Sequence, residues 1–216
     1  KKVTVIKNGA DFSLYKRPLH GYVDFSRELG LEGKFVASYF GTHGMAHHLE
    51  TVLEAARELT DWKDIVFLLV GDGAERSRLV AMRDEMKLSN VVMLDQQPKE
   101  KMPELWSLSS VSLVLLKKSA LFKTVLPSKI FESMAMERPV ILGVEGESAE
   151  LVMSAGGGIC IEPESAKDLA SQVLKLYRDP TMCQKLGSSG RRYVLEHFDR
   201  KVLARRFADV MKLVCR

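Results

Sequence analysis

Short hydrophobic runs alternate along the chain with longer stretches in which apolar residues recur at helical spacing. Six of these runs are rich in β-branched or other apolar residues, at 34–40, 65–70, 91–94, 111–116, 140–144 and 159–161. Most are continuously apolar, which is typical of strands that are covered on both faces of a parallel sheet. The runs therefore predict an α/β fold, a Rossmann-like doubly wound parallel sheet of about six strands.

The stretches between the runs predict the helices that would cover this sheet. Leu49, Val52, Leu53 and Ala56 fall on one face of a helix over 47–59, and similar spacing predicts helices over 74–88 and 128–136. Strands joined by helices of this length form βαβ units with right-handed crossovers. We interpret residues 34–164 as one Rossmann-like domain.

The two ends of the chain depart from this alternation. Residues 1–33 hold a strand-like run at 3–6, a loop with Asn8-Gly9 and Pro18, and a helical pattern near 22–29, which together indicate an entry segment. Residues 165–216 predict C-terminal helices that pack on the domain, at 167–177, 181–186, 191–197 and 199–214. Asp179-Pro180 and the stretch 187–190, which begins and ends with glycine, would break these helices.

Composition narrows the class of protein. With 46% hydrophobic and 28% charged residues, the chain matches soluble globular proteins. Its longest apolar run, at 65–70, falls well short of the roughly 18 residues of a membrane-spanning helix. The chain opens with Lys1-Lys2 rather than a signal peptide, and because it does not begin with Met we expect the natural protein to extend further at this end. Three cysteines without a C-x-x-C spacing indicate reduced thiols in a cytoplasmic protein.

Charge limits the kind of ligand. The net charge of +4 suits an anionic small molecule or a membrane surface and is too small for a nucleic-acid-binding protein. In an open parallel sheet, ligands bind beyond the carboxyl ends of the strands. The loops that follow the strands are therefore the places to look for function.

The first of these loops is glycine-rich. Gly41, Thr42 and Gly44 follow the first long strand, and a helix is expected near His47. Glycine lets backbone approach a ligand, and a helix N-terminus presents N–H groups to phosphate. The loop is neither G-x-G-x-x-G nor a P-loop, so a nicotinamide cofactor is poorly supported. A plain strand–helix turn explains the residues equally well.

Two further loops carry weaker signals. The Gly-Asp-Gly turn at 71–73 is a generic turn in which Asp72 would cap the next helix. The loop at 95–98 contains Gln96 and Gln97, whose amides would suit the edge of a nucleobase, with Met102 nearby. A polar loop in which Pro98 starts the next helix is the alternative.

The loop at 117–126 is the most informative. It contains Lys117, Lys118 and Lys123, and leads through Leu126 and Pro127 to a helix that Ser128 would cap, with Lys129 in the first turn and Glu132 one turn on. A lysine in a first turn opposes the helix dipole. The placement makes sense if an anion occupies that N-terminus, and Glu132 would then face hydroxyl groups from the same side.

Metal and hydrolase chemistry find little support. His43 and His47 are spaced i, i+4, but no acidic or cysteine cluster lies near them in the sequence. No G-x-S-x-G nucleophile elbow occurs. We therefore expect no metal and no bound cofactor.

These residues, in their order and spacing, resemble the C-terminal nucleotide-sugar-binding domain of GT-B glycosyltransferases, in the retaining family four, also called group 1. The resemblance covers nearly the whole chain. It is carried by the Asn-Gly-Ala-Asp-Phe segment at 8–12, the loop and helix at 41–55, the Val-Gly-Asp-Gly turn at 70–73, and the stretch at 127–141. The pattern is most similar to bacterial polysaccharide enzymes of the N-acetylfucosamine transferase-like branch.

The resemblance implies roles for several residues. Glu132 takes the position of the glutamate that binds ribose hydroxyls, and Thr124 stands where the family has the glutamate that meets the donor sugar. Thr42 and His47 align with the two cations of the family's phosphate loop. Charge on the diphosphate would then be met by Lys129 and its helix N-terminus, with Lys123 second. Gly41, Gly44, Leu126, Pro127 and Ser128 complete the expected site, and the loop at Gln96, Gln97 and Met102 would hold the base.

The resemblance also implies a reaction. A hexosyltransferase-type enzyme of polysaccharide biosynthesis would move a sugar from a nucleotide diphosphate donor, with UDP the expected nucleotide, to a polysaccharide or lipid-linked acceptor, with retention. Lys129 and Glu132 would act as catalytic residues by stabilising the leaving group and orienting the donor. The acceptor would bind an N-terminal domain that this sequence lacks, so we expect the isolated domain to be inactive. A peripheral association of the full protein with the inner face of the membrane is a further expectation.

Three alternatives stay open at this point. One is a nucleotide-sugar epimerase of the same GT-B architecture, which would need acid–base carboxylates near the donor. A second is a non-catalytic nucleotide-binding module, which the absence of the two loop cations favours. The third is an α/β interaction domain without a ligand, against which Lys129 and Glu132 argue.

Overall fold

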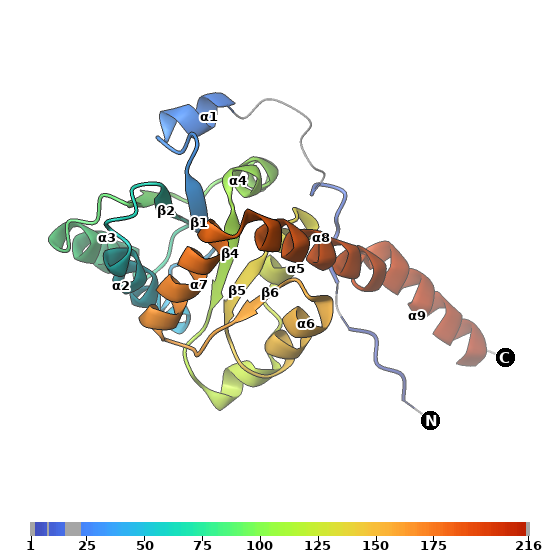
Figure 1. The fold of residues 1–216 in the computed structure, drawn as a ribbon. Coiled ribbons are helices and arrows are strands. Elements are labelled where there is room, and N and C mark those ends of the chain that lie inside the picture. Colours follow the sequence, from blue (N-terminus) through green and yellow to red (C-terminus); the bar gives the residue numbers. More distant parts are fainter. Residues whose placement is uncertain (1–2, 8, 16–22, 215–216) are drawn as a thin grey trace.

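The computed structural model describes residues 3–7, 9–15 and 23–214 (Figure 1). The strands are β1 (Phe35–Phe40), β2 (Ile65–Val70), β3 (Val91–Leu94), β4 (Val111–Leu115), β5 (Val140–Gly143) and β6 (Gly158–Cys160). The α-helices are α1 (Val23–Glu28), α2 (Glu50–Glu58), α3 (Arg76–Glu85), α4 (Met102–Leu108), α5 (Ser128–Ala135), α6 (Glu147–Ala155), α7 (Ala166–Arg178), α8 (Pro180–His197) and α9 (Arg200–Val214). Short 3-10 helices are η1 (Met45–His47), η2 (Lys99–Lys101) and η3 (Ala120–Thr124).

The strands form one parallel sheet in the order β3-β2-β1-β4-β5-β6. β1 and β2 pair along their whole length, from Phe35 opposite Ile65 to Phe40 opposite Val70. The predicted fold class is confirmed, and each strand begins and ends within one residue of a predicted run. Strand order reverses between β1 and β4, and such a switch point leaves a crevice at the carboxyl ends of the strands.

Helices cover both faces of the sheet (Figure 1). Alternate strand residues point to opposite sides, so Val36 and Phe40 belong to one core and Ala37 and Tyr39 to the other. α2, α3 and α7 contribute buried side chains to the core that contains Tyr39, and α4, α5, α6 and α8 contribute to the core that contains Phe40. Both faces are therefore occupied by packing, which leaves the loops at the ends of the strands to bind ligands.

Helix α8 is continuous, so the break predicted at 187–190 is wrong. A Cβ on Gly187 would lie 2.2 Å from the carbonyl oxygen of Glu137, and a Cβ on Gly190 would lie 3.0 Å from Cγ of Met134. The two glycines let α8 approach α5 and the turn after it. Each costs about 1 kcal/mol of helix propensity relative to alanine, which close packing against α5 offsets.

The entry segment contains no strand at residues 3–6, so that prediction is also wrong. Val3 and Val5 are 75% and 80% exposed, and within the described residues they pair with no strand. β-Branched residues favour a strand only where a partner and a packing surface are present. The segment is held further along, where Ala10 forms an isolated parallel bridge with Asp199. Asn8, Pro18, Tyr22 and Cys215 lie outside the described residues.

The predicted helices are somewhat longer than the observed ones. The helix expected over 47–59 begins at Glu50, after η1, and the one expected over 74–88 spans Arg76–Glu85. α4 and α6, which have seven and nine residues, were not predicted. None of the helices in the described part of the chain is long and apolar enough to cross a membrane.

Candidate functional site

A cavity of about 610 Å³ opens at the carboxyl ends of β1, β2 and β4. Ten residues that the sequence assigns to the site line it: Gly41, Thr42, His47, Gln96, Gln97, Met102, Pro127, Ser128, Lys129 and Glu132. Gly44, Thr124 and Leu126 do not line it. Tyr15, Asp72 and Lys99 line it as well, although sequence analysis assigns none of them to ligand binding. Loops from separate parts of the chain thus converge on one cavity.

The loops after β1 and β2 touch through their glycines. Gly41 and Gly71 adopt φ values of 139° and 153°, and a Cβ on Gly71 would lie only 1.9 Å from the carbonyl oxygen of Gly41. A Cβ on Gly41 would lie 2.9 Å from Nζ of Lys129. Glycine at position 41 is therefore what allows the lysine ammonium to approach the loop backbone.

Lys129 supplies the ammonium group beside these loops. It is the second residue of α5, and its Nζ lies 3.9 Å from the centroid of the Tyr39 ring, in a favourable cation–π contact. Desolvation lowers the pKa of Lys129 to about 7, and the nearby carboxylate of Glu132 opposes part of that shift. An anion bound beside this ammonium would favour its protonated form.

Two histidines lie beside the same loop, and both are held neutral. His43 is fully buried, neither of its ring nitrogens has a hydrogen-bond partner, and burial together with Arg76 and Lys129 lowers its pKa to about 4. Nδ1 of His47 lies 3.2 Å from the carbonyl oxygen of Leu115, which can only accept, so Nδ1 carries the proton. Burial and Lys129 also lower the pKa of His47. Neither histidine replaces a phosphate-binding cation at neutral pH.

The spacing of the histidines does not create a metal site. Among residues 3–7, 9–15 and 23–214, no three histidine, cysteine, aspartate or glutamate side chains gather in a way that could hold a metal ion. That the reaction needs no metal stays a prediction.

Glu132 lies one turn after Lys129 on α5 and is half-buried. Desolvation raises the pKa of its carboxyl group, while the Tyr15 hydroxyl and the positive charges of Lys99 and Lys129 act in the opposite direction. The buried indole of Trp106 acts in that same direction, although its Nε1 makes no hydrogen bond of standard geometry. Glu132 is thus a hydrogen-bond acceptor set among polar donors in the cavity wall.

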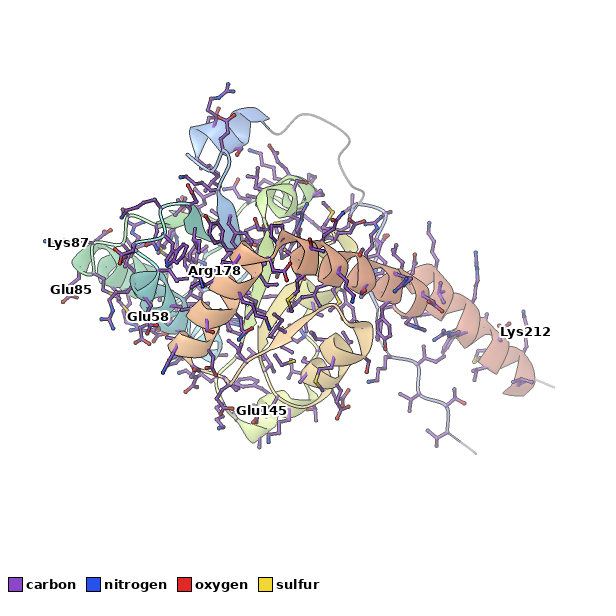
Figure 2. All side chains as sticks on the ribbon, viewed as in Figure 1. Glu58, Glu85, Lys87, Glu145, Arg178 and Lys212 are labelled. Carbon is purple, nitrogen blue, oxygen red and sulfur yellow. The ribbon has the colours of Figure 1, made fainter. Side chains whose placement is uncertain are left out.

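The side chains of the lysine-rich loop face carboxylates on the surface. Nζ of Lys118 is paired with Glu162, and Nζ of Lys123 lies 3.1 Å from a carboxylate oxygen of Glu145. Glu145 lies at the outer edge of the molecule in Figure 2. Lys117, Lys118 and Lys123 do not line the cavity. The secondary role expected for Lys123 at a phosphate therefore finds no support in its position.

Two predicted helix caps are wrong. Pro127 is the N-cap of α5 and Ser128 its first residue, and no side chain caps this helix. The Asp72 carboxylate accepts a hydrogen bond of 2.8 Å from the N–H of Gly73, whereas the N-cap of α3 is Glu75. The N–H of Ile130 donates to the carbonyl oxygen of Pro127 at 3.1 Å, and the N–H groups of Ser128 and Lys129 are left for solvent or an anion.

The loop at 95–98, which would hold a base, is fixed by two polar contacts. Arg76 pairs with Asp95 from the start of α3, and the Gln97 amide donates a hydrogen bond of 3.1 Å to the carbonyl oxygen of Asp95. The Arg76–Asp95 pair joins the start of α3 to this loop, 19 residues further along the chain. Sequence analysis offers no signal for the Arg76–Asp95 pair.

Known proteins share both the sequence pattern and this fold. The family model for glycosyl transferases group 1 matches residues 24–193. The chain is 27% identical over 214 residues to WcaI of Escherichia coli K12, a glycosyl transferase provisionally assigned to colanic acid biosynthesis, covering 97% of this chain and 51% of that protein. It thus spans about half the length of that relative.

Solved structures show the same fold. A crystal structure of Anabaena Alr3699/HepE in complex with UDP superposes with a TM-score of 0.86 at 20% identity, covering 97% of this chain and 57% of that one. The C-terminal domain of the Francisella tularensis group 1 glycosyl transferase LpcC superposes with a TM-score of 0.72 at 18% identity, covering 89% of this chain and all of that domain.

Proposed function

The chain belongs to the group 1 glycosyl transferases, and from this premise we propose that it is the donor-binding half of a retaining enzyme that uses a UDP-sugar. The observation that carries the proposal is the position of Lys129 and Glu132, one turn apart on α5, in a cavity at the switch point of the sheet. A cation at a helix N-terminus suits a diphosphate, and a carboxylate suits vicinal hydroxyl groups.

Each end of the cavity suits one part of the nucleotide. The backbone around Gly41, the N-terminus of α5 and Lys129 would bind the diphosphate. Glu132 would accept hydrogen bonds from the ribose, and the loop with Gln96 and Gln97 would contact the base. The UDP bound in the HepE structure, which has the same fold, supports uracil as the base.

The same groups account for the chemistry that we propose. Negative charge accumulates on the diphosphate as the bond to the sugar breaks, and fixed donors that point at those oxygens lower the barrier. The Lys129 ammonium and the N–H groups of Ser128 and Lys129 would supply this stabilisation, because Thr42 carries no charge and His47 is neutral. Leaving-group stabilisation is thereby concentrated on one helix.

The proposal extends to the acceptor of the sugar. The colanic acid assignment of WcaI and the resemblance to N-acetylfucosamine transferases support a bacterial polysaccharide or lipid-linked acceptor. Because the chain spans about half of that relative, we propose that a further domain supplies the acceptor site and that this chain alone binds nucleotide without transferring sugar. Sugar transfer by the chain alone would contradict the second part.

Calorimetric titration with UDP, GDP, ADP and NAD tests the proposal. UDP should bind selectively, and Glu132→Ala should weaken it by about 1.5–3 kcal/mol, roughly ten- to a hundredfold, because a charged hydrogen-bond acceptor is lost. Glu145→Ala is the matched control, since this surface carboxylate pairs with Lys123 outside the cavity. Equal binding of all four nucleotides, or equal loss in both variants, would contradict the assignment.

A further inference from the structure

We propose that Tyr15 is a positioning residue for nucleotide recognition, whose hydroxyl fixes the Glu132 carboxylate in the orientation that accepts the ribose hydroxyls. The inference rests on the proposed function, because it concerns the ribose end of the same cavity. It brings the entry segment, which lies more than a hundred residues from α5 in sequence, into the binding site.

A local turn directs Tyr15 into the cavity. The Asp11 carboxylate accepts a hydrogen bond of 2.9 Å from the N–H of Ser13, and the N–H of Tyr15 donates one of 3.1 Å to the carbonyl oxygen of Phe12. Phe12 is buried in the core, and Tyr15 is only 5% exposed although it lines the cavity. The phenol ring is therefore fixed by packing rather than free at the surface.

The turn is anchored to the C-terminal helices and, through them, to α5. The N–H of Ala10 donates to the carbonyl oxygen of Phe198 at 3.0 Å, and the carbonyl oxygen of Ala10 accepts from the N–H of Arg200 at 3.0 Å. The Phe198 ring packs on Phe131 with centroids 4.9 Å apart, and Phe131 immediately precedes Glu132. Tyr15 and Glu132 thus approach each other from one packed scaffold.

The chemistry of the pair suits positioning. Tyr15 and Glu132 line the same cavity, and burial beside that carboxylate raises the pKa of the phenol, which keeps its hydroxyl a neutral donor. Lys99 and Lys129 also face the carboxylate, but Nζ of Lys129 lies over the Tyr39 ring, and the side chain of Lys99 has four torsions whereas that of a tyrosine has two. One bond from Tyr15 leaves the other lone pairs of the carboxylate for a ligand.

The experiment compares UDP with 2′,3′-dideoxyuridine diphosphate, which lacks the ribose hydroxyls, by direct and displacement calorimetry on the 216-residue chain. Tyr15→Phe keeps the packed ring and removes only the hydroxyl. UDP should bind about two- to tenfold more weakly to this variant, as for the loss of one hydrogen bond, while the dideoxy compound should bind it as it binds the unchanged chain. Tyr177→Phe is the control, because that ring packs against Phe35 at the far end of β1.

The outcomes separate the inference from its premise. If the unchanged chain binds UDP and Glu132→Gln weakens that binding, the contact between Glu132 and the ribose is established. With that contact in place, an unchanged affinity of Tyr15→Phe for UDP overturns the role of Tyr15, and so does an equal loss for both compounds, which would indicate general distortion. No UDP binding by the unchanged chain overturns the proposed function and removes the inference with it.

Discussion

The affinity for UDP should fall as the pH rises above 7, because the Lys129 ammonium, which would meet the diphosphate, loses its proton there. Desolvation places the pKa of Lys129 at about 7, and the anion prefers the protonated lysine. His43, whose pKa is about 4, and His47, whose pKa is also lowered, are already neutral in this range. Above pH 7 the loss of affinity should therefore report the proton of Lys129.

The magnitude follows from the protonated fraction. With a pKa of about 7, that fraction falls from about half at pH 7 to about 3% at pH 8.5, so affinity should fall about fifteenfold. This holds if the bound lysine stays protonated throughout. A charge at about 4 Å in an effective dielectric of about 20 contributes about 4 kcal/mol, which is enough to keep the bound lysine protonated up to pH 8.5.

Calorimetric titrations between pH 7 and pH 8.5 measure the effect, because UDP carries its full charge once its last phosphate proton is lost near pH 6. Binding at pH 7 should also take up about half a proton. This uptake is measured by repeating the titration in two buffers that differ in ionisation enthalpy. Lys129→Met should bind weakly with no pH dependence. An affinity of the unchanged chain that stays constant to pH 8.5, while Lys129→Met still loses binding, would refute the titration of Lys129.

Three further changes test other parts of the structure. Gly41→Ala should weaken UDP binding, because a side chain at a φ of 139° strains the loop and its Cβ, 2.9 Å from Nζ of Lys129, would displace the ammonium. Gly44→Ala, with no contact closer than 3.5 Å, should bind normally in the same titration. Gly187→Ala should lower the free energy of unfolding by about 1–3 kcal/mol in urea titrations, because of its contact with Glu137, and Ser188→Ala should not. Since the folded pKa of Lys129 lies below the unfolded one, the unfolded chain binds more protons above pH 7, so stability should rise from pH 7 to pH 9 by more than in Lys129→Met.

The sheet could be predicted from the sequence because its strands are buried on both faces. All six residues of β2 are buried, so the strand is apolar throughout and is recognised in the sequence without knowing its neighbours. The run at 3–6 has similar residues but no partner strand among the described residues, and its own sequence does not show that difference. Gly187 and Gly190 led to a wrong prediction because, in sequence, a glycine that permits close helix packing looks the same as one that ends a helix.

Some parts of the site could be predicted from the sequence and others could not. Its loops follow from strand order, because the carboxyl ends of parallel strands meet at one edge. The lysines at 118 and 123 were misleading, since Glu162 and Glu145, which pair with them, come from later parts of the chain. Tyr15 could not be predicted, because its approach to the cavity depends on the pairing of Ala10 with Phe198 across the fold.

Lys129 and Glu132 were detectable for a geometric reason that also limits what the site can bind. Residues three apart on a helix share one face and differ by about 4.5 Å along its axis. Ile130 and Met134, on the other side of α5, are fully buried in the core, so the helix cannot rotate to move one polar group without the other. The cation and the carboxylate are therefore held at a fixed spacing, and a ligand must present its anion and its hydroxyl groups at matching positions, as the diphosphate and ribose of a nucleotide do.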